Sequence, residues 1–241
     1  MAVTEFKIEY SEVLAACENA VPVIIVAAGS SSRMGGINKM FVSISGIPVI
    51  ARTLLCFERS RFVSEIVVVT KKESVADVLR LKDEYMISKL TVVTEGGNDR
   101  LSSVLNGLNA LSDDTNGVMI HDGARPLVSD ALIEKMAKAS NKYDCAVCGI
   151  PLKDTIKQKG EFTKTLDRSS LVAVQTPQSV NFSKYKALLS KIEDKSLYTD
   201  DASVMESAGY NTEIIDGEES NIKITTPFDI KLAEILLKEE F

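Results

Sequence analysis

The chain has 241 residues, 45% of them hydrophobic, which allows one α/β core with a small excursion. Its formal net charge of −6 and isoelectric point near 5.1 argue against general binding of nucleic acid or of a membrane surface. No apolar run approaches the roughly 18 residues of a membrane span, and residues 1–20 lack the apolar core of a secretion signal.

Apolar, β-branched runs alternate with amphipathic stretches along the chain, a pattern typical of a mostly parallel sheet flanked by helices. Residues 1–20 are expected to be an N-terminal extension ahead of a single domain at 21–241. Strands are expected at 23–26, 65–70, 90–94, 117–121, 145–150 and 212–215. Helices are expected at 48 to about 59, 73 to about 88, 101 onward, 130 to about 141, from about 199–201 onward, and 227 to about 239. Pro48 is expected at the first position of the first of these helices, Ser129 caps the fourth, and Pro227 opens the last.

This alternation breaks between Lys153 and Gln178. Residues 155–157 and 162–166 alternate in polarity around a Lys-Gly turn, which predicts a β-hairpin. A single small hairpin is only marginally stable in water. We therefore expect a β-arm at about 152–178 that packs on a second copy of the chain.

Two of the four cysteines, Cys145 and Cys148, form a C-x-x-C sequence inside an apolar strand. Alternate residues of a strand point to opposite faces, so the two thiols should lie on different sides of the sheet. This predicts buried strand cysteines and not a metal site. Reduced thiols favour a cytoplasmic protein.

The first expected strand, 23–26, runs into a stretch of small residues that contains Gly29 and is followed by Arg33 and Lys39. Small side chains let backbone N–H groups approach phosphate oxygens, and cations neutralise the remaining charge. The alternative is a flexible connection that happens to be rich in Gly and Ser, and the segment alone favours a polyphosphate site only modestly.

Two familiar nucleotide-binding patterns are excluded. A Walker A loop requires Gly-Lys followed by Ser or Thr, whereas Lys39 stands between Asn38 and Met40. A dinucleotide fingerprint requires G-x-G-x-x-G and an acidic residue after the second strand, but Gly29 is followed by three serines and that strand ends at Thr70 with two lysines behind it. The expected phosphate site belongs to another class.

Three expected strands end in segments with complementary chemistry. Ligands of open parallel sheets bind outside the carboxyl ends of the strands. There the Gly29 loop supplies a phosphate cradle, Gly96-Gly97 supplies backbone groups that could read a base, and Asp122 supplies a hard oxygen suited to Mg²⁺. In isolation a turn-forming or helix-capping role for Asp122 fits equally well. Together the three segments predict a metal–nucleotide site.

His121 is the single histidine of the chain and precedes Asp122. Adjacent strand residues point to opposite faces, so the two side chains should not form a catalytic dyad. We expect His121 to be a packing residue or to support the site from behind.

Segments throughout the chain after Ala20 match one family in order and spacing. They are 27–29 with Arg33-Met34 and Asn38-Lys39, Gly96-Gly97 with Arg100, 121–126, Pro151 with 154–157, 168–171, 175–178, 199–203 and 221–227. On these segments the chain resembles the 2-C-methyl-D-erythritol 4-phosphate cytidylyltransferases of the non-mevalonate isoprenoid pathway.

The resemblance implies a Rossmann-like fold, a homodimer with interlocking β-arms, and Mg²⁺-dependent transfer of CMP from CTP to methylerythritol phosphate. The catalytic residues it implies are Arg33, Lys39, Arg168 and Lys223. The nucleotide-binding residues are Ala27, Ala28, Gly29, Gly97, Asn98, Ser103 and Asp122, of which Asp122 would also hold Mg²⁺. Arg125 and Thr155 would bind the acceptor, with Thr155 and Arg168 coming from the arm of the opposite subunit.

The chain departs from the family pattern at three positions. Ser31 replaces a glycine found in many members, Asn98 replaces an aspartate found in some, and Ser220 replaces a carboxylate found in some. The last change leaves a second metal ligand in doubt.

Two other functions stay open at this point. Ribitol 5-phosphate cytidylyltransferases share the fold and the use of CTP, and the Gly-Ala pair after Asp122 favours methylerythritol phosphate over that acceptor. A non-catalytic nucleotide-binding protein on the same scaffold should have lost some of the cationic residues. The four that the resemblance implies as catalytic are all present: Arg33, Lys39, Arg168 and Lys223.

Overall fold

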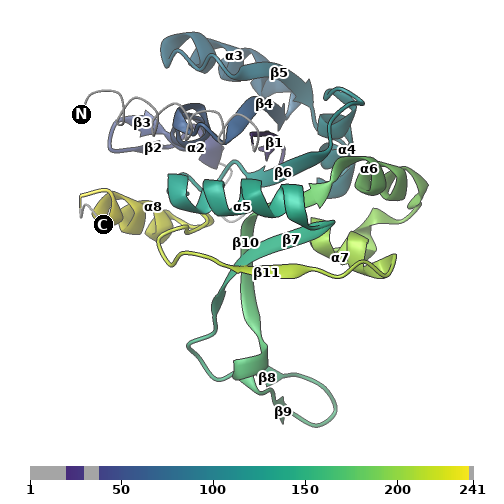
Figure 1. Cartoon of the computed structure of the whole chain (residues 1–241). Coiled ribbons are helices and arrows are strands. Elements are labelled where there is room, and N and C mark those ends of the chain that lie inside the picture. Colours follow the sequence, from purple (N-terminus) through teal and green to yellow (C-terminus); the bar gives the residue numbers. More distant parts are fainter. Residues whose placement is uncertain (1–19, 30–37, 239–241) are drawn as a thin grey trace, which may run out of the picture.

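The computed structural model describes residues 20–29 and 38–238, in which a central sheet carries helices on both faces (Figure 1). Within these ranges the main sheet has seven strands in the order β11-β7-β10-β6-β1-β4-β5. The strands are β1 (Val21–Val26), β4 (Val63–Thr70), β5 (Leu90–Glu95), β6 (Gly117–Asp122), β7 (Cys145–Pro151), β10 (Val172–Asn181) and β11 (Glu213–Asp216). Only β10 runs antiparallel to its neighbours in this described sheet, which confirms the mostly parallel α/β fold.

Two hydrophobic clusters cover the two faces of the sheet. Val23 and Ile25 of β1 belong to one cluster with side chains of α2, α3 and α5, whereas Ile24 and Val26 belong to the other with α4, α6 and α7. The helices are α2 (Val49–Arg59), α3 (Val75–Glu84), α4 (Arg100–Asn109), α5 (Asp130–Lys142), α6 (Phe182–Lys191), α7 (Asp201–Ser207) and α8 (Pro227–Leu236). Within the described ranges none of them is long and apolar enough to cross a membrane.

Several predicted helix boundaries hold, and others shift by a few residues. Ser129 caps α5, and Pro227 occupies the first turn of α8, both as predicted. Pro48 is the residue before α2 and not its first helical residue, because it pairs with Ser43 in a two-stranded ribbon formed by β2 (Ser43–Ile44) and β3 (Ile47–Pro48). Helix α3 ends at Glu84, earlier than predicted, because Met86 takes a left-handed backbone conformation with φ of 52°.

Neither β10 nor α6 was predicted from the sequence. β10 is the antiparallel strand inside the sheet. The β-arm was expected to extend to Gln178, and this is wrong from Val172 onward, where the chain belongs to the main sheet. The strand is hard to recognise because it carries buried polar side chains, Gln175, Thr176, Gln178 and Ser179, in place of an apolar alternation. Each of these groups has a hydrogen-bond partner in the fold, which makes their burial tolerable.

The two C-x-x-C cysteines lie on opposite faces of β7, as predicted. Cys145 belongs to the cluster under α4, α6 and α7, and Cys148 belongs to the cluster on the other face. Both are buried and free. The part of the chain that the structure describes contains no group of three or more His, Cys, Asp or Glu side chains able to hold a metal.

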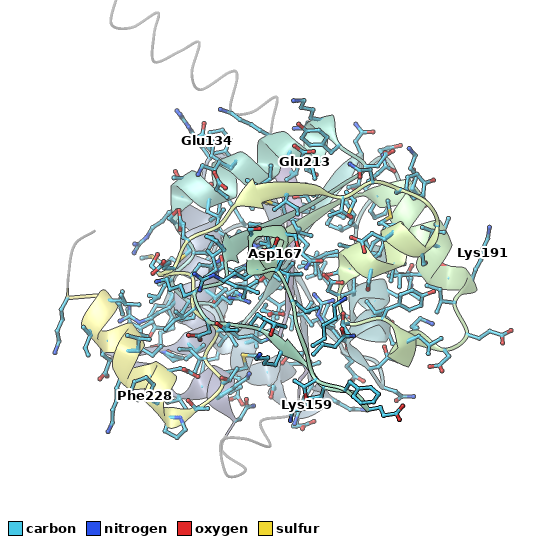
Figure 2. All side chains as sticks on the ribbon, turned by 90° about the horizontal axis from the view of Figure 1, so that it is seen from below. Glu134, Lys159, Asp167, Lys191, Glu213 and Phe228 are labelled. Carbon is cyan, nitrogen blue, oxygen red and sulfur yellow. The ribbon has the colours of Figure 1, made fainter. Side chains whose placement is uncertain are left out.

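The predicted hairpin is present and short. Two-residue strands β8 (Lys157–Gln158) and β9 (Lys164–Thr165) pair antiparallel, and the arm projects from the sheet below β7 and β10 (Figure 1). Seen from below, Lys159 and Asp167 lie on this arm, over the face of the molecule turned to the viewer (Figure 2). Phe162 is 84% exposed there. A single exposed apolar side chain is common on protein surfaces, and the role of the arm in dimerisation stays a prediction.

Candidate functional site

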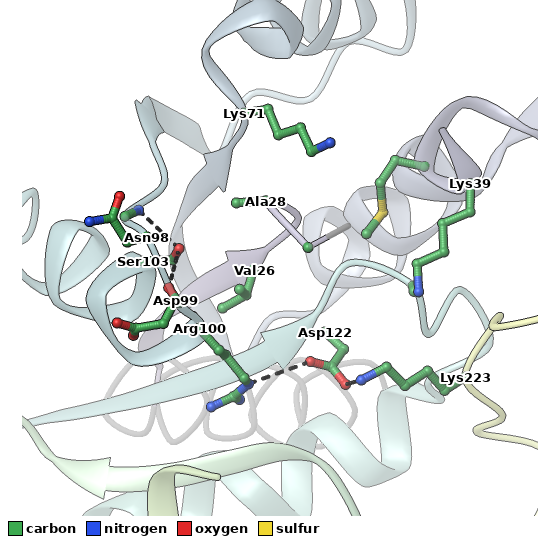
Figure 3. Close-up of a pocket in the computed structure, with 14 residues that line it drawn as sticks. Val26, Ala28, Lys39, Lys71, Asn98, Asp99, Arg100, Ser103, Asp122 and Lys223 are labelled. Atoms are coloured by element: carbon green, nitrogen blue, oxygen red, sulfur yellow. Dashed lines mark hydrogen bonds and ion pairs between the residues drawn. The ribbon is translucent and has the colours of Figure 1, made fainter. Parts of the chain in front are cut away.

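A cavity of about 400 Å³ opens at the carboxyl ends of β1, β5 and β6 (Figure 3). We call it the first cavity. Its lining includes eight residues predicted from the sequence: Ala28, Gly29, Lys39, Gly97, Asn98, Ser103, Asp122 and Lys223. The structure therefore brings together loops that are far apart in the chain, as expected for a site at this edge of a parallel sheet.

Close packing of small residues shapes one wall of this cavity. A methyl group on Gly96 would come within 2.4 Å of the Ala28 Cβ, so only glycine fits there without a shift. The Gly97 N–H donates to the Ser103 hydroxyl oxygen at 3.0 Å, and that hydroxyl donates to the carbonyl of Asp99 at 2.9 Å. At Gly29, by contrast, a methyl group would meet no described atom within 4 Å.

Lys39 reaches the first cavity from the opposite side. It begins a short 3₁₀ turn, Lys39–Phe41, which the side chain of Asn38 caps. The side chain is 9% exposed, and its ammonium donates to the Ile224 carbonyl at 3.0 Å. This bond and the burial of the side chain hold the ammonium in a fixed position at the wall of the cavity.

Asp122 lies at the centre of a group of cations. Figure 3 shows its carboxylate between Arg100 and Lys223, and Lys223 Nζ lies 2.7 Å from Asp122 Oδ2. Arg125 Nε lies 3.7 Å from the same oxygen, and Arg100 Nε lies 4.0 Å from Oδ1. Burial alone would raise the pKa of Asp122, but Lys223, Arg100 and Arg125 outweigh it and lower that pKa to about 2. The carboxylate is thus ionised at neutral pH, and the cluster keeps an excess of positive charge.

Lys223 owes its position to the segment that joins β11 to α8. The Asn221 side chain is fully buried and donates to the Thr176 carbonyl at 2.8 Å, and the Asn221 carbonyl accepts from Arg125 Nη1 at 2.7 Å. Ile224 N donates to the Ala124 carbonyl at 2.8 Å. These bonds fasten the segment to β10 and to the loop that follows Asp122.

A second cavity of about 450 Å³ adjoins the first, and Arg100, Asp122 and Lys223 line both. Its other walls come from Arg125, from Asp200 with its neighbour Thr199, and from polar and apolar residues of β10, among them Thr176 and Gln178. Two buried guanidinium atoms have no hydrogen-bond partner among the described residues: Nη1 of Arg100, which lines both cavities, and Nε of Arg125, which lines the second. Because buried donors are normally satisfied, both suit an anionic ligand.

His121 lies behind the site, as predicted, with its ring fully buried and 4.8 Å from that of Phe57. Nε2 lies 3.2 Å from the Arg125 carbonyl, which can only accept, so Nε2 carries the proton. Nδ1 therefore accepts from the Thr176 hydroxyl at 3.1 Å, and that hydroxyl oxygen accepts from Asp122 N at 3.0 Å. The ring orients its neighbours and does not face the cavities.

Three predicted residues, Ala27, Thr155 and Arg168, line neither cavity of the single chain. Arg33, like Ser31, lies outside the described residues. Ala27 is 4% exposed and packs in the hydrophobic core under the first cavity. Thr155 and Arg168 are exposed on the arm, where Arg168 donates to the Lys153 carbonyl.

Sequence reasoning had not assigned a role to Arg100 or Lys71, although both line the first cavity. Arg100 belongs to one of the segments that match the family, and it directly follows the helix cap Asp99. This position at the start of a helix could have indicated a functional role. A cation in the first turn of a helix opposes the helix dipole, so such a residue calls for another explanation.

Comparison with known proteins gives the family. A family model described as IspD, 2-C-methyl-D-erythritol 4-phosphate cytidylyltransferase, matches residues 21–239. Proteins of that name from Halalkalibacterium halodurans and Clostridium tetani are 40% and 42% identical to this chain over 222 and 224 residues. Each alignment covers 90% of this chain, and they cover 97% and 89% of the relatives.

Solved structures agree with the family model. A 4-diphosphocytidyl-2C-methyl-D-erythritol synthase from Anaerococcus prevotii superposes with a TM-score of 0.81 at 28% identity, over 93% of this chain and 99% of that one. The 2-C-methyl-D-erythritol 4-phosphate cytidylyltransferase from Thermus thermophilus gives 0.74 at 28% identity, over 91% and 100%. The chain therefore belongs to the 2-C-methyl-D-erythritol 4-phosphate cytidylyltransferase family.

Proposed function

We propose that the chain transfers the cytidylyl group of CTP to 2-C-methyl-D-erythritol 4-phosphate. An oxygen of the acceptor phosphate attacks the α-phosphorus of CTP, and the bond from that phosphorus to the bridging oxygen of the β-phosphate breaks. Pyrophosphate leaves with the electron pair, and 4-diphosphocytidyl-2-C-methyl-D-erythritol forms. The attacking oxygen is already ionised, so the reaction needs no general base, in keeping with a histidine buried away from both cavities.

One observation carries this proposal: Lys223 and Arg100 flank the Asp122 carboxylate where the two cavities meet. Catalysis of phosphoryl transfer is mostly positioning and electrostatic stabilisation, which convergent cations supply. Lys39, together with Arg33, would stabilise the negative charge that develops on the α-phosphate and on the departing pyrophosphate. Lys223 would hold the acceptor phosphate for in-line attack.

The first cavity is the proposed nucleotide site. Ala27, Ala28, Gly29, Gly97, Asn98, Ser103 and Asp122 would surround the nucleotide. The Gly97 and Asn98 backbone would read the cytosine edge, while the space beside Gly29 would take the phosphates. The second cavity would take the acceptor, with Arg125 at its phosphate.

We also propose Mg²⁺ as the cofactor. Mg²⁺ usually binds one or two carboxylates together with substrate phosphates, and Asp122 is an ionised carboxylate facing the nucleotide cavity, so the residues fit the ion. Asp122 would be its protein ligand, and the ion would neutralise charge shared between phosphates. Lys223 pairs with Asp122 at 2.7 Å in the described structure, so binding of the ion would redirect this carboxylate.

Thr155 and Arg168 are proposed to reach the second cavity of a partner chain, completing a homodimer through the arms. Both are exposed and line neither cavity of their own chain. We propose a cytoplasmic location because Cys56, Cys145 and Cys148 are free thiols.

The reaction is tested by supplying CTP and Mg²⁺ with either methylerythritol phosphate or ribitol 5-phosphate and measuring pyrophosphate release. We expect turnover with the first acceptor. Turnover with ribitol 5-phosphate alone would overturn the proposed acceptor, and CTP binding with no turnover on either would favour the non-catalytic alternative.

Lys39→Ala tests the electrostatic mechanism. We expect kcat to fall on the order of 10²- to 10³-fold, as when one preorganised donor to a developing anion is lost, with an unchanged circular dichroism spectrum. Lys191→Ala, at the exposed end of α6, is the matched control and should retain the wild-type rate. A Lys39→Ala variant that turns over at nearly the wild-type rate would contradict the role proposed for this residue.

A further inference from the structure

Arg100 lines both cavities, at the point where the nucleotide and the acceptor would meet. It is the first residue of α4, so its charge opposes the dipole of its own helix. Intrinsic helix stability therefore does not explain a cation at this position. The reach of its side chain toward Asp122 offers an explanation (Figure 3).

A buried pair of acidic and phenolic groups holds this guanidinium in place. Arg100 Nη2 lies 2.6 Å from Asp201 Oδ2, and the Tyr185 hydroxyl donates to Asp201 Oδ1 at 2.6 Å. Asp201 and Tyr185 are both fully buried. The contact joins three helices, since Arg100 begins α4, Tyr185 lies in α6 and Asp201 begins α7.

Strand β10 fixes Asp201 in turn. The side-chain oxygen of Gln178 accepts from the backbone N–H groups of Asp201 and Ala202, each at 3.1 Å. The side-chain nitrogen of Gln178 donates to Asp200 Oδ2 at 2.9 Å. Both the oxygen and the nitrogen of the Gln178 side chain therefore hold the start of α7.

Stability is a poor reason for such an arrangement. Burial of an ion pair costs desolvation that often cancels its attraction, and apolar groups of similar volume would frequently stabilise a fold as well. Arg100 also leaves Nη1 buried without a partner among the described residues. An incompletely satisfied cation between two cavities suits an anion that is present only during the reaction.

We propose that Arg100 is a further catalytic residue that contacts the reacting phosphates where the cavities meet, and that Asp201 and Tyr185 are positioning residues that orient its guanidinium. Arg100 lowers the repulsion between the anionic acceptor and the triphosphate and stabilises the charge that builds up around the α-phosphorus. This inference rests on the proposed cytidylyl transfer.

A double-mutant cycle tests it. Arg100→Gln should lower kcat about 10- to 100-fold, and Asp201→Asn should lower it about tenfold because the guanidinium loses its fixed orientation. Arg100→Gln also leaves a buried carboxylate unpaired and should lower Tm. The double variant has a neutral Gln-Asn pair, so its Tm should recover toward the wild-type value while its kcat stays at that of Arg100→Gln. The KM for CTP should change less than threefold in all three.

Recovery of kcat together with Tm in the double variant would show that the pair acts only on folding and would overturn the proposal, as would Arg100→Gln with wild-type kcat. The exposed pair Arg80 and Asp77 of α3, 2.9 Å apart and outside both cavities, allows the same substitutions as a control that should leave kcat unchanged. Turnover by the wild-type chain reports on the proposed function, and the ratio of variant to wild-type kcat reports on Arg100, so the two can fail separately.

Discussion

At the scale of single residues, burial shifts the pKa of His121, which lies at the carboxyl edge of the sheet. Burial lowers the pKa of His121 to about 4, and the hydrogen bond to the Arg125 carbonyl and the charge of Asp122 only partly oppose that shift. The imidazole is therefore neutral at physiological pH, as its hydrogen bonds to the Arg125 carbonyl and the Thr176 hydroxyl also require. An unfolded chain would protonate the same ring near its ordinary pKa of 6.5.

This difference predicts how stability depends on pH in the absence of nucleotide and metal. Between pH 6.5 and 4 the unfolded chain binds the extra proton at His121, so the free energy of unfolding should fall by roughly 3 kcal/mol as the pH is lowered. The lowered pKa of Asp122 acts below its ordinary value of 3.8, in a separate window. Urea denaturation of the wild type and of His121→Gln checks this prediction, and the variant should lack the decline. Equal declines in both proteins would refute the assignment.

At the scale of elements, the loops after β1 and β5 contact each other through glycine and alanine. A methyl group on Gly96 would overlap the Ala28 Cβ at 2.4 Å and approach the Ser103 hydroxyl at 3.0 Å, whereas one on Gly29 would meet no described atom. We expect Gly96→Ala to lower stability by about 1–3 kcal/mol through overpacking and to weaken CTP binding.

Gly29→Ala should leave Tm unchanged and raise the KM for CTP about tenfold, because the added methyl would occupy space proposed for phosphate. Thermal unfolding and initial-rate kinetics measure the two effects. Gly160→Ala, on the open arm, is the control for both variants. Unchanged KM for CTP in Gly29→Ala would exclude the phosphates from that part of the cavity.

At the scale of the whole molecule, we propose that two chains share each site. Lys39 lines the first cavity, whereas Arg168 lies on the arm and lines neither cavity of its own chain. If each site takes Lys39 from one chain and Arg168 from the other, a Lys39→Ala chain paired with an Arg168→Ala chain has one intact site. Equal co-expression makes half of the dimers mixed, so about one quarter of the wild-type activity should return.

Purified co-expressed dimers, assayed for pyrophosphate release beside each single variant, measure this recovery. Activity that stays at the level of the single variants would show that Lys39 and Arg168 of the same chain act together. A control with Lys191→Ala in place of Arg168→Ala should recover more, since every subunit with an intact Lys39 then keeps a working site.

Much of the fold followed from local pattern. The strands at 23–26 and 145–150 were recognisable because apolar, β-branched residues cover both of their faces, and the cysteine pair separated onto opposite faces by the same alternation. β10 was not predicted because its middle is polar. Its strand conformation depends on partners that are distant in sequence, such as Asp200 and Met136.

The sequence by itself determined the alternation of strands and helices, the loops at one edge of the sheet, and the residues available for phosphate chemistry, because period and residue type are local properties. Only the tertiary structure decided that Arg100, Lys223 and Arg125 meet around Asp122 and that Asp201 and Tyr185 hold Arg100 from behind. Charges interact through space, over a few ångströms and in a medium set by burial, so their pairing depends on how distant segments pack and not on their spacing along the chain.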